Sequence, residues 1–310
     1  MPRPMMLGIV GDSASGKSTL TRGLARVLGE DRVTHVCTDD YHRFDRAERR
    51  RVGITPLDPE CNYMDILESH LRELRAARAI LKPVYRHTDG TFGPPEYVRS
   101  ARFCVVEGLL GFHTAELRSS YDCMVFLDPP EELRRSWKVL RDTTRRGYTT
   151  DQVLAELDRR EADSARWIRP QREHADIVVS FQPGALPDQA HLDAHLLLRP
   201  TLPHPDLSGL VGDRPDDIVM ERPGNGDQLL KVPGLLPPGR AEEIEGAIWE
   251  RMHFAMHLRT ERLGEFTRGG DLLRADALAI TQLLLLYHVV TARAAIALGG
   301  DARRVGTPAE

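Results

Sequence analysis

The sequence of 310 residues lacks several features that would point to particular classes of protein. It has only four cysteines, and none shows the paired CxxC spacing of a zinc site. Its formal net charge is -4, so it lacks the overall positive charge that drives non-specific binding to nucleic acid. We therefore expect no nucleic-acid partner, and any anion-binding surface must come from local groups of Arg and Lys.

Signals for secretion and for membrane insertion are also scarce. Nothing at the N-terminus resembles a secretory apolar region, which together with the scattered cysteines predicts a reduced, cytoplasmic location. One apolar stretch, residues 277–298, approaches the length of a membrane span, but it carries Gln282, His288 and Arg293. We interpret it as a buried helix and expect no membrane contact.

The sequence does contain a regular alternation of apolar patterns. Apolar residues make up 41% of the chain, enough for a sizeable core. Runs of strand type alternate with helical patterns, and these runs cover residues 5–10, 33–37, 103–107, 123–127 and 176–181. Such alternation predicts an α/β fold in which helices cover both faces of a mainly parallel sheet.

Two regions depart from the alternation. Turn signals at residues 89–90 and 94–95 predict a hairpin-type insertion between residues 81 and 99. Pro and Gly become frequent after Phe181, and two helical stretches close the chain. We therefore predict two domains, residues 1–182 and residues 183–310, of which the second is a mixed, partly helical extension for packing or subunit contact. His253 and His257, one helical turn apart there, lack a third metal ligand and are read as ordinary helix positions.

The stretch GDSASGKST fits the GxxxxGK[ST] pattern and stands between an apolar run and a helical pattern. Glycines in such a loop let backbone N–H groups point at phosphate oxygens beside a helix N-terminus. Lys17 would reach the outer phosphates of ATP, and Ser18 would hold Mg²⁺. The predicted nucleotide-binding loop comprises Gly11, Asp12, Ser13, Ala14, Ser15, Gly16, Lys17, Ser18 and Thr19.

This motif narrows the predicted fold class to a three-layer sandwich of the P-loop NTPase type. By itself it does not separate kinases from GTPases, helicases or transport ATPases.

Two adjacent carboxylates follow the second strand-type run, in the stretch TDDYHRFDRAERRR. The carboxyl ends of parallel strands line the ligand crevice of such sheets, so Asp39 is a candidate base for an acceptor hydroxyl. Arg46 is a candidate clamp for a phosphate already on the acceptor. In the alternative interpretation, Asp39 and Asp40 cap a helix, His42 is structural and the arginine run is a solvated helix face.

Two further charged positions point to phosphate chemistry. Glu107 ends a buried strand-type run, where it could face the phosphate loop through Mg²⁺ or its water shell; a plain hydrogen-bonded carboxylate is the alternative. Lys138, Arg141 and Arg145 recur at i, i+3 and i+7, and Arg146 precedes a glycine helix stop. These cations suit a lid that stabilises transferring phosphate, although cations also complement helix ends generally.

The stretches TDDYHRFDR, KPVYRH, VVEGL and KVLRDTTRRGYTTD together resemble the phosphoribulokinases, within the wider family of P-loop kinases that includes uridine kinase. The resemblance implies transfer of the γ-phosphoryl group of ATP, with Mg²⁺, to the 1-hydroxyl of D-ribulose 5-phosphate. The products would be ADP and D-ribulose 1,5-bisphosphate, the acceptor for carbon fixation in the Calvin cycle.

The resemblance also implies roles for individual residues. The catalytic base falls on Asp39, although its neighbour Asp40 resembles a second acidic residue of some relatives, and the choice between them stays open. Catalysis would further use Lys17, Glu107, Lys138 and Arg141. Substrate contacts would come from Asp40, His42, Arg46, Tyr85, His87 and Arg141. Arg146 would contact the nucleotide, and Ser18 and Glu107 would be the magnesium ligands.

Two positions depart from the family pattern. Asp151 stands where glutamate is usual. Relatives switched by thioredoxin carry one cysteine in the phosphate loop and one before the aspartates, whereas this chain has Ser15 and Cys37 at those places. We therefore predict no redox switch of that type.

Other functions remain open at this point. A uridine, cytidine or pantothenate kinase is the nearest enzyme alternative, and a non-catalytic nucleotide-binding regulatory module is an alternative of another class. A two-fold homodimer is the commonest assembly for soluble oligomers and is the expectation here.

Overall fold

The computed structural model describes residues 2–186, 188, 191–212, 214, 216–252, 258, 262–268 and 271–300, with the backbone alone at residues 145 and 268. The chain divides into two compact units, which are described separately. Unit 1 consists of Met1–Lys17, Asp31–Leu127 and Arg134–Ala175. Unit 2 consists of Ser18–Glu30, Asp128–Leu133 and Asp176–Glu310.

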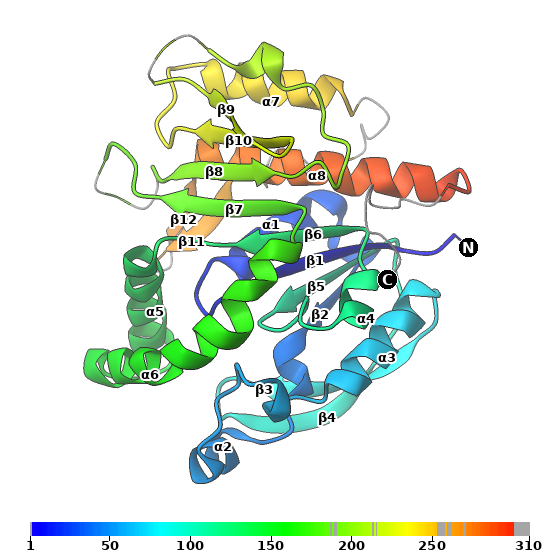
Figure 1. Cartoon of the computed structure of the whole chain (residues 1–310), viewed down its shortest axis with the longest axis vertical. Coiled ribbons are helices and arrows are strands. Elements are labelled where there is room, and N and C mark those ends of the chain that lie inside the picture. Colours follow the sequence, from blue (N-terminus) through cyan, green and yellow to red (C-terminus); the bar gives the residue numbers. More distant parts are fainter. Residues whose placement is uncertain are drawn as a thin grey trace. The chain divides into compact units, whose positions relative to one another are not determined.

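Unit 1 contains a parallel sheet with the strand order β2-β5-β1-β6 (Figure 1). Its strands are β1 (Met5–Gly11), β2 (Val33–Cys37), β5 (Phe103–Gly108) and β6 (Cys123–Leu127). Every residue of β1, β5 and β6 is buried, which explains why these strands appear in the sequence as continuous apolar runs. The predicted α/β fold with a mainly parallel sheet is confirmed.

Helices and one hairpin complete unit 1. The helices are α2 (Arg46–Val52), α3 (Met64–Arg75), α4 (Ala115–Ser119), α6 (Thr150–Asp163) and most of α5 (Glu131–Arg145). Helix α3 buries Leu67, Leu71 and Leu74, which recur at helical spacing along one face. The predicted hairpin forms from the antiparallel strands β3 (Ile80–Arg86) and β4 (Thr91–Val98).

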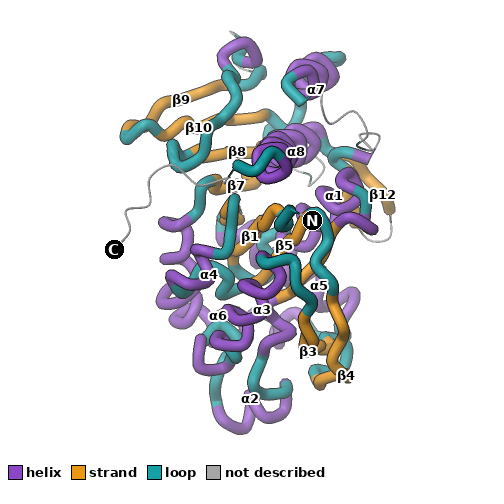
Figure 2. The backbone as a smooth tube through the Cα atoms, turned by 90° about the vertical axis from the view of Figure 1, so that its right-hand side faces the viewer, coloured by secondary structure: helices purple, strands orange, loops and turns teal. Residues whose placement is uncertain are grey.

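The hairpin and helix α2 lie side by side at one end of unit 1 (Figure 2). The backbone N–H of Arg46 donates to the carbonyl of Gly90 at 2.8 Å. A side chain on Gly90, whose φ is +79°, would approach Arg46 to 2.6 Å. The turn between β3 and β4 therefore needs glycine both for its backbone conformation and for this close contact.

Unit 2 has an antiparallel sheet with the order β7-β8-β10-β9, and a separate hairpin of β11 and β12. These strands are β7 (Ile177–Gln182), β8 (Asp193–Leu198), β9 (Val219–Gly224), β10 (Asp227–Val232), β11 (Glu265–Arg268) and β12 (Asp271–Arg274). Its helices are α7 (Arg240–Glu250), α8 (Asp276–Ala297) and α1 (Lys17–Leu28), which begins at the last residue of the first segment of unit 1.

Helix α8 is the apolar stretch singled out in the sequence. Among the described residues it is the one helix long and apolar enough to cross a membrane, a test that buried core helices also pass. Two thirds of its most apolar window, 67%, is buried in the protein. Its Gln282 is fully buried and accepts a hydrogen bond from the N–H of Gly264 at 2.8 Å. The prediction of a buried helix is confirmed.

The region after residue 182 holds more strand than the sequence analysis foresaw. Two closing helices were expected, and α7 and α8 are present, but β8 to β12 were not identified. Strand β8 alternates half-buried and buried residues over only six positions, a short pattern that Pro- and Gly-rich flanks obscure. His253 and His257 lie outside the described residues, and the domain boundary near residue 183 stays a prediction.

Candidate active site

The phosphate-type loop connects β1 to α1, as its motif requires. A side chain at Gly11 would lie 2.5 Å from the carbonyl oxygen of Leu127, and Gly16 has a φ of +99°, so both positions need glycine. The ammonium group of Lys17 donates to the carbonyl oxygens of Gly11 at 2.9 Å and Asp12 at 2.8 Å. Lys17 thus folds back over the loop, and its role at the phosphates stays a prediction.

The loop is held by residues that the sequence analysis missed. The hydroxyl of Ser164 donates to the carboxylate of Asp12, which also accepts from the N–H of Ser13 at 2.6 Å. Arg134 of α5, only 5% exposed, donates to the carbonyl of Ser13 at 3.1 Å. Ser164 opens a single turn of π-helix after α6, a feature frequent at functional sites but invisible in a residue pattern.

Two of the predicted loop residues, Ser18 and Thr19, continue helix α1 within unit 2. Their predicted roles in holding Mg²⁺ and nucleotide stay predictions.

The adjacent aspartates sit on a short helical turn, Thr38–Tyr41, directly after β2, and their surroundings differ. Asp40 is buried, and its two carboxylate oxygens accept from the ammonium of Lys82 at 2.5 Å and from the N–H of Tyr85 at 2.8 Å. The side chain of Asp39 is 25% exposed, and its carboxylate lies 3.5 Å from the imidazole Nε2 of His87. Asp40 therefore ties β2 to the hairpin, while Asp39 faces the site.

Electrostatics keep Asp39 ionised. Burial acts to raise its pKa, but the fields of His42, His87, Lys17 and Arg49 outweigh that effect and hold the pKa below its ordinary value. A carboxylate that is charged at neutral pH and reachable from solvent can accept a proton from a hydroxyl group. Asp39 is also one of the residues that line a small hollow with Thr38, Tyr41, Pro56, Asn62, Met64, Leu67, Leu109 and Leu110.

His42 and Tyr85 are both buried, and their rings meet edge to face with centroids 5.0 Å apart. His42 shares a hydrogen bond of 2.7 Å with the amide oxygen of Asn62. The hydroxyl of Tyr85 accepts from the guanidinium of Arg49 at 2.5 Å. Arg49 was missed because the run RAERRR resembles a solvated face. Its position three residues after Arg46, on the same side of the helix, was the available signal.

Arg46 contacts His87, the first residue after β3 in the hairpin turn. The guanidinium of Arg46 donates to the backbone carbonyl of His87 at 2.6 Å. Burial lowers the pKa of His87, and the charge of Asp39 partly opposes this shift. The structure thus brings four predicted substrate residues, His42, Arg46, Tyr85 and His87, to the side of the site that holds Asp39.

Glu107 lies at the buried end of β5, next to the aspartate turn. A side chain on the following residue, Gly108, would come within 1.7 Å of the hydroxyl of Thr38, so glycine permits the close approach of β5 to that turn. The carboxylate of Glu107 lies 3.0 Å from the imidazole of His35. Burial lowers the pKa of Lys17, and the charges of Glu107 and Asp39 partly oppose this shift, which places these groups within electrostatic reach.

Cations of α5 and of the residue that follows it gather around one carboxylate, that of Asp142, to which the sequence analysis gave no role. Asp142 accepts from Lys138 at 2.6 Å and Arg141 at 2.8 Å, and Arg146 lies 3.5 Å away. These four residues form what we call the α5 cluster. Burial opposes the ionisation of Asp142, but hydrogen bonds and charge from Arg141 and Lys138 bring its pKa to about 2. Burial lowers the pKa of Lys138 to about 8.

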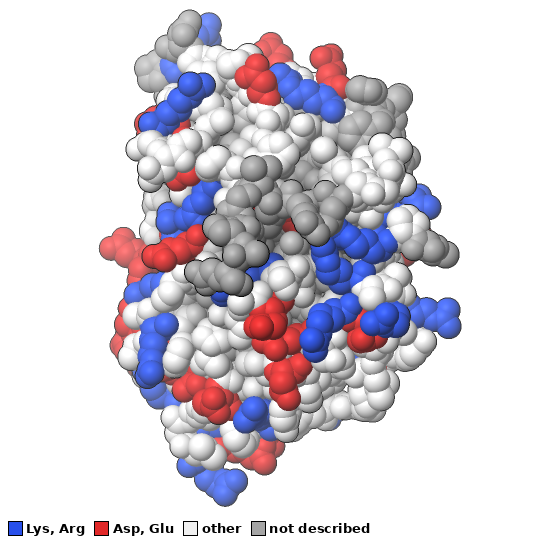
Figure 3. Space-filling model, turned by 45° about the vertical axis from the view of Figure 1, so that its right-hand side comes forward, with Lys and Arg blue, Asp and Glu red and all other residues white. Residues whose placement is uncertain are grey.

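The α5 cluster and the aspartate turn act on each other electrostatically. Arg141 and Arg146 influence the pKa of His87, and Asp39 influences that of Arg146. On the face drawn in Figure 3, basic and acidic side chains are intermixed, so the charge relevant to anion binding is local. The described part of unit 1 therefore combines a phosphate-type loop, an ionised carboxylate and a group of cations.

Comparison with known proteins agrees with this geometry. Residues 6–186, more than half of the 310-residue chain, match the family described as Phosphoribulokinase / Uridine kinase. The chain is 38% identical to the phosphoribulokinase of Synechocystis sp. over 186 residues, which are 60% of this chain and 56% of that protein. It is 29% identical to the uridine kinase of Chlamydia pneumoniae over 181 residues, 56% of this chain and 81% of that protein.

The chain thus spans about half the length of the curated phosphoribulokinases it matches. Among solved structures, phosphoribulokinase from Rhodobacter spheroides superposes with a TM-score of 0.58 at 20% identity, covering 82% of this chain and 99% of that one. This likeness concerns the fold, a P-loop kinase fold that extends well beyond residue 182. By the match over residues 6–186, the chain belongs to the phosphoribulokinase / uridine kinase family.

Proposed function

We propose that the chain catalyses ATP-dependent phosphorylation of D-ribulose 5-phosphate at its 1-hydroxyl, giving D-ribulose 1,5-bisphosphate and ADP. The observation that carries the proposal is the contrast between the neighbouring aspartates. Asp40 is committed to Lys82 and to the N–H of Tyr85, whereas Asp39 is ionised, partly exposed and within the electrostatic reach of Lys17. The identity to a curated phosphoribulokinase supports the choice of substrate.

In the proposed reaction, the carboxylate of Asp39 accepts the proton of the 1-hydroxyl as its oxygen attacks the γ-phosphorus of ATP. The bond between the γ-phosphorus and the β,γ-bridging oxygen breaks, and ADP leaves. Lys17 would contact the outer phosphates of ATP. The cations Lys138 and Arg141 would stabilise negative charge as it redistributes, and Arg146 would contact the nucleotide.

Mg²⁺ would be held by oxygen ligands at the loop and the strand end. The carboxylate of Glu107 fits this role because it is an oxygen donor, lies at the end of a buried strand and acts electrostatically on Lys17. The hydroxyl of Ser18, the residue after Lys17, would be the second ligand. When bound, Mg²⁺ supplies charge neutralisation on the outer phosphates.

The phosphate already on the acceptor would be bound by Arg46, whose planar guanidinium suits a bidentate contact with phosphate oxygens. Asp40, His42, Tyr85 and His87 would shape the pocket, and Arg141 would reach the acceptor from α5. A nucleoside acceptor would need an aromatic face for base stacking. Tyr85 does not offer one, because it is buried against Arg49 and touches His42, His87 and Phe92 edge to face.

A coupled assay of ADP release tests the proposal. The purified full chain, with ATP and Mg²⁺, should turn over with D-ribulose 5-phosphate and show little activity with uridine, cytidine or pantothenate. Turnover with a nucleoside but none with ribulose 5-phosphate would instead favour the uridine kinase branch of the family. Tight ATP binding without turnover on any acceptor would favour a regulatory nucleotide-binding module.

Assembly and location belong to the same proposal. We take residues 183–310 as an extension that serves packing or subunit contact, and we place the protein in the cytoplasm. We expect a homodimer, because two-fold homodimers are the commonest soluble oligomers. Light scattering coupled to size exclusion should give twice the chain mass of 34.8 kDa.

A further inference from the structure

Cys37 stands apart from the other cysteines of the chain. All four are free thiols, and Cys61, Cys104 and Cys123 are buried while Cys37 is half-buried. Cys37 is the last residue of β2, two positions before Asp39, and pairs in register with Glu107 of β5. Its thiol therefore lies at the strand ends that carry the candidate active site.

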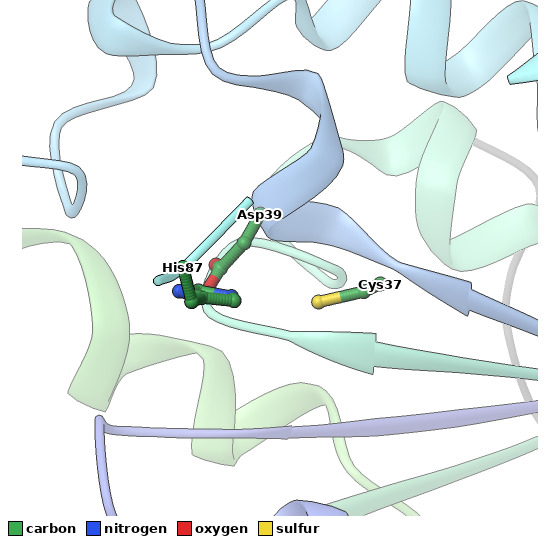
Figure 4. Close-up of side chains that lie close together, drawn as sticks. All are labelled: Cys37, Asp39 and His87. Carbon is green, nitrogen blue, oxygen red and sulfur yellow. The ribbon is translucent and has the colours of Figure 1, made fainter. Parts of the chain in front are cut away.

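The thiol sulfur of Cys37 converges with two other potential metal ligands. One ligand atom each from Cys37, Asp39 and His87 lie within 4.8 Å of one another, and the carboxylate and imidazole atoms of the latter two are 3.5 Å apart. Figure 4 shows Asp39 and His87 meeting, with the sulfur of Cys37 directed toward them. The three residues come from β2, from the turn after it and from the loop after β3.

The three donor types select a particular class of ion. Zinc binds thiolate sulfur at about 2.3 Å and imidazole nitrogen or carboxylate oxygen at about 2.0–2.2 Å, usually in a tetrahedron. Tetrahedral geometry with these bond lengths separates the ligand atoms by roughly 3.3–3.7 Å. The Asp39–His87 distance of 3.5 Å already satisfies this range, and the sulfur of Cys37, within 4.8 Å of both other ligand atoms, would move closer to them on binding. Mg²⁺ prefers an all-oxygen shell and would be excluded.

The local field also favours a cation at this place. The carboxylates of Asp39, Asp40 and Glu107 all lie at the strand ends that carry Cys37, because the two aspartates follow β2 directly and Glu107 pairs in register with Cys37. The same three carboxylates attract a dication, which would replace the thiol proton. Lys17 and Arg141 act against this attraction, since they too lie within electrostatic reach of the site.

We propose that Cys37, Asp39 and His87 form a binding site for a thiophilic divalent cation of the Zn²⁺ class, with a fourth position open to water. On binding, the S–H bond of Cys37 loses its proton to solvent and the sulfur bonds to the metal, with no change of oxidation state. Asp39 is also the base of the proposed kinase reaction. A metal bound to its carboxylate therefore prevents proton transfer and inhibits the enzyme.

Metal binding is tested without any assay of turnover. The full chain, freed of chelator, is titrated with Co²⁺ as a spectroscopic substitute for Zn²⁺. The wild type should bind one Co²⁺ with a sulfur-to-cobalt absorption band in the near ultraviolet, and Zn²⁺ should displace it. Cys37→Ser should lose the band, and His87→Gln should weaken Zn²⁺ binding by at least about tenfold.

His195→Gln serves as the matched control, because His195 is a half-exposed histidine of β8 that belongs to no such ligand group among the described residues. It should bind Co²⁺ as the wild type does. A wild type without the band, or a Cys37→Ser variant that binds Zn²⁺ as tightly as the wild type, would overturn the proposal. Circular dichroism of each variant establishes that a lost band reflects a lost ligand and not a failure to fold.

The inhibitory part rests on the proposed function and is measured separately. Zn²⁺ should inhibit phosphorylation of ribulose 5-phosphate competitively with the sugar phosphate and not with ATP, and inhibition should be at least about tenfold weaker for Cys37→Ser relative to that variant's own activity. A cobalt band in a chain that turns over no acceptor would refute the kinase assignment and keep the metal site. Turnover without the cobalt band would refute the metal site and keep the kinase assignment.

Discussion

Two groups of charged side chains in unit 1 are similarly buried, but their carboxylates differ in the ionic and hydrogen-bond partners that they have. In the α5 cluster, the carboxylate of Asp142 meets Lys138, Arg141 and Arg146. At the strand ends, Asp40 is saturated by Lys82 and a backbone N–H, whereas Asp39 contacts His87 at 3.5 Å. We call Asp39, Asp40, Glu107 and their partners Lys17, Lys82 and His87 the strand-end cluster.

This difference teaches that burial of a carboxylate does not identify a base. Asp142 and Asp40 are both more deeply buried than Asp39, and both are engaged in short ionic contacts that fix neighbouring elements in place. Asp39 is ionised without such a contact, and we propose that it is the one that takes up the proton. The predictions below test this division of roles.

The largest effect is expected from Asp39→Asn. The amide cannot accept the proton of the acceptor hydroxyl, so kcat should fall by about 10²–10⁴-fold, the usual contribution of a general base. The Kd for ATP should stay nearly unchanged, because Lys17 and the loop are intact. Steady-state turnover and calorimetric ATP binding measure the two quantities. Turnover close to that of the wild type would remove Asp39 from the role of base.

The neighbouring change, Asp40→Asn, should act on stability instead. It leaves the buried ammonium of Lys82 with only the exposed carboxylate of Glu96, 3.9 Å away, and the loss of one partner of a buried pair costs on the order of 3–5 kcal/mol. The free energy of unfolding, measured with urea, should fall by an amount of this order. Under conditions where the variant is folded, it should keep more turnover than Asp39→Asn. An unchanged unfolding free energy would contradict the structural role of the Asp40–Lys82 pair.

A smaller effect should appear in the pH dependence of activity. Lys138 is charged below its pKa of about 8 and becomes neutral above it, so the α5 cluster loses one cation as the pH rises through that value. The logarithm of kcat/KM should therefore decline above about pH 8. Lys138→Arg, which stays charged, should move this decline to higher pH. A profile that is the same for both proteins would separate Lys138 from the reaction.

The same pKa has the opposite sign for stability. The pKa of Lys138 in the folded protein, about 8, lies below the ordinary lysine value of 10.5, so its burial costs stability at low pH. This cost is relieved as the pH rises from about 8 to 10.5. Activity and stability are thus expected to respond in opposite directions over this interval, which distinguishes loss of a catalytic cation from simple unfolding.

Local patterns in the sequence predicted the parts of the site that are continuous in the chain. The phosphate-type loop, the aspartate turn and the hairpin each have a signature within about ten residues, set by glycine geometry, strand ends and turn residues. The tendency of parallel strands to collect ligand groups at their carboxyl ends then placed Asp39 and Glu107 together. These inferences need no knowledge of distant contacts.

The rest depended on pairings that no local pattern encodes. Asp40 is separated from Lys82 by 42 residues, and Ser164 from Asp12 by 152. Which of two adjacent aspartates is committed to a structural ion pair is decided by such a partner, so the sequence left the pair unresolved. Strands β8 to β10 were missed for a related reason, because a short antiparallel strand is stabilised mainly by its neighbours across the sheet.

The smallest effect is expected from reductants. Ser15 is fully buried in the loop, and a serine there cannot form a disulfide with Cys37. In metal-free buffer, a phosphine reductant or thioredoxin should change the activity by less than about twofold, because no disulfide at these positions constrains the strand-end cluster. Dithiothreitol, which also chelates zinc, should raise the activity only of protein that has been exposed to Zn²⁺. Activation by the phosphine in the absence of metal would show that Cys37 is controlled by oxidation, and restoration by dithiothreitol alone would assign that control to the metal.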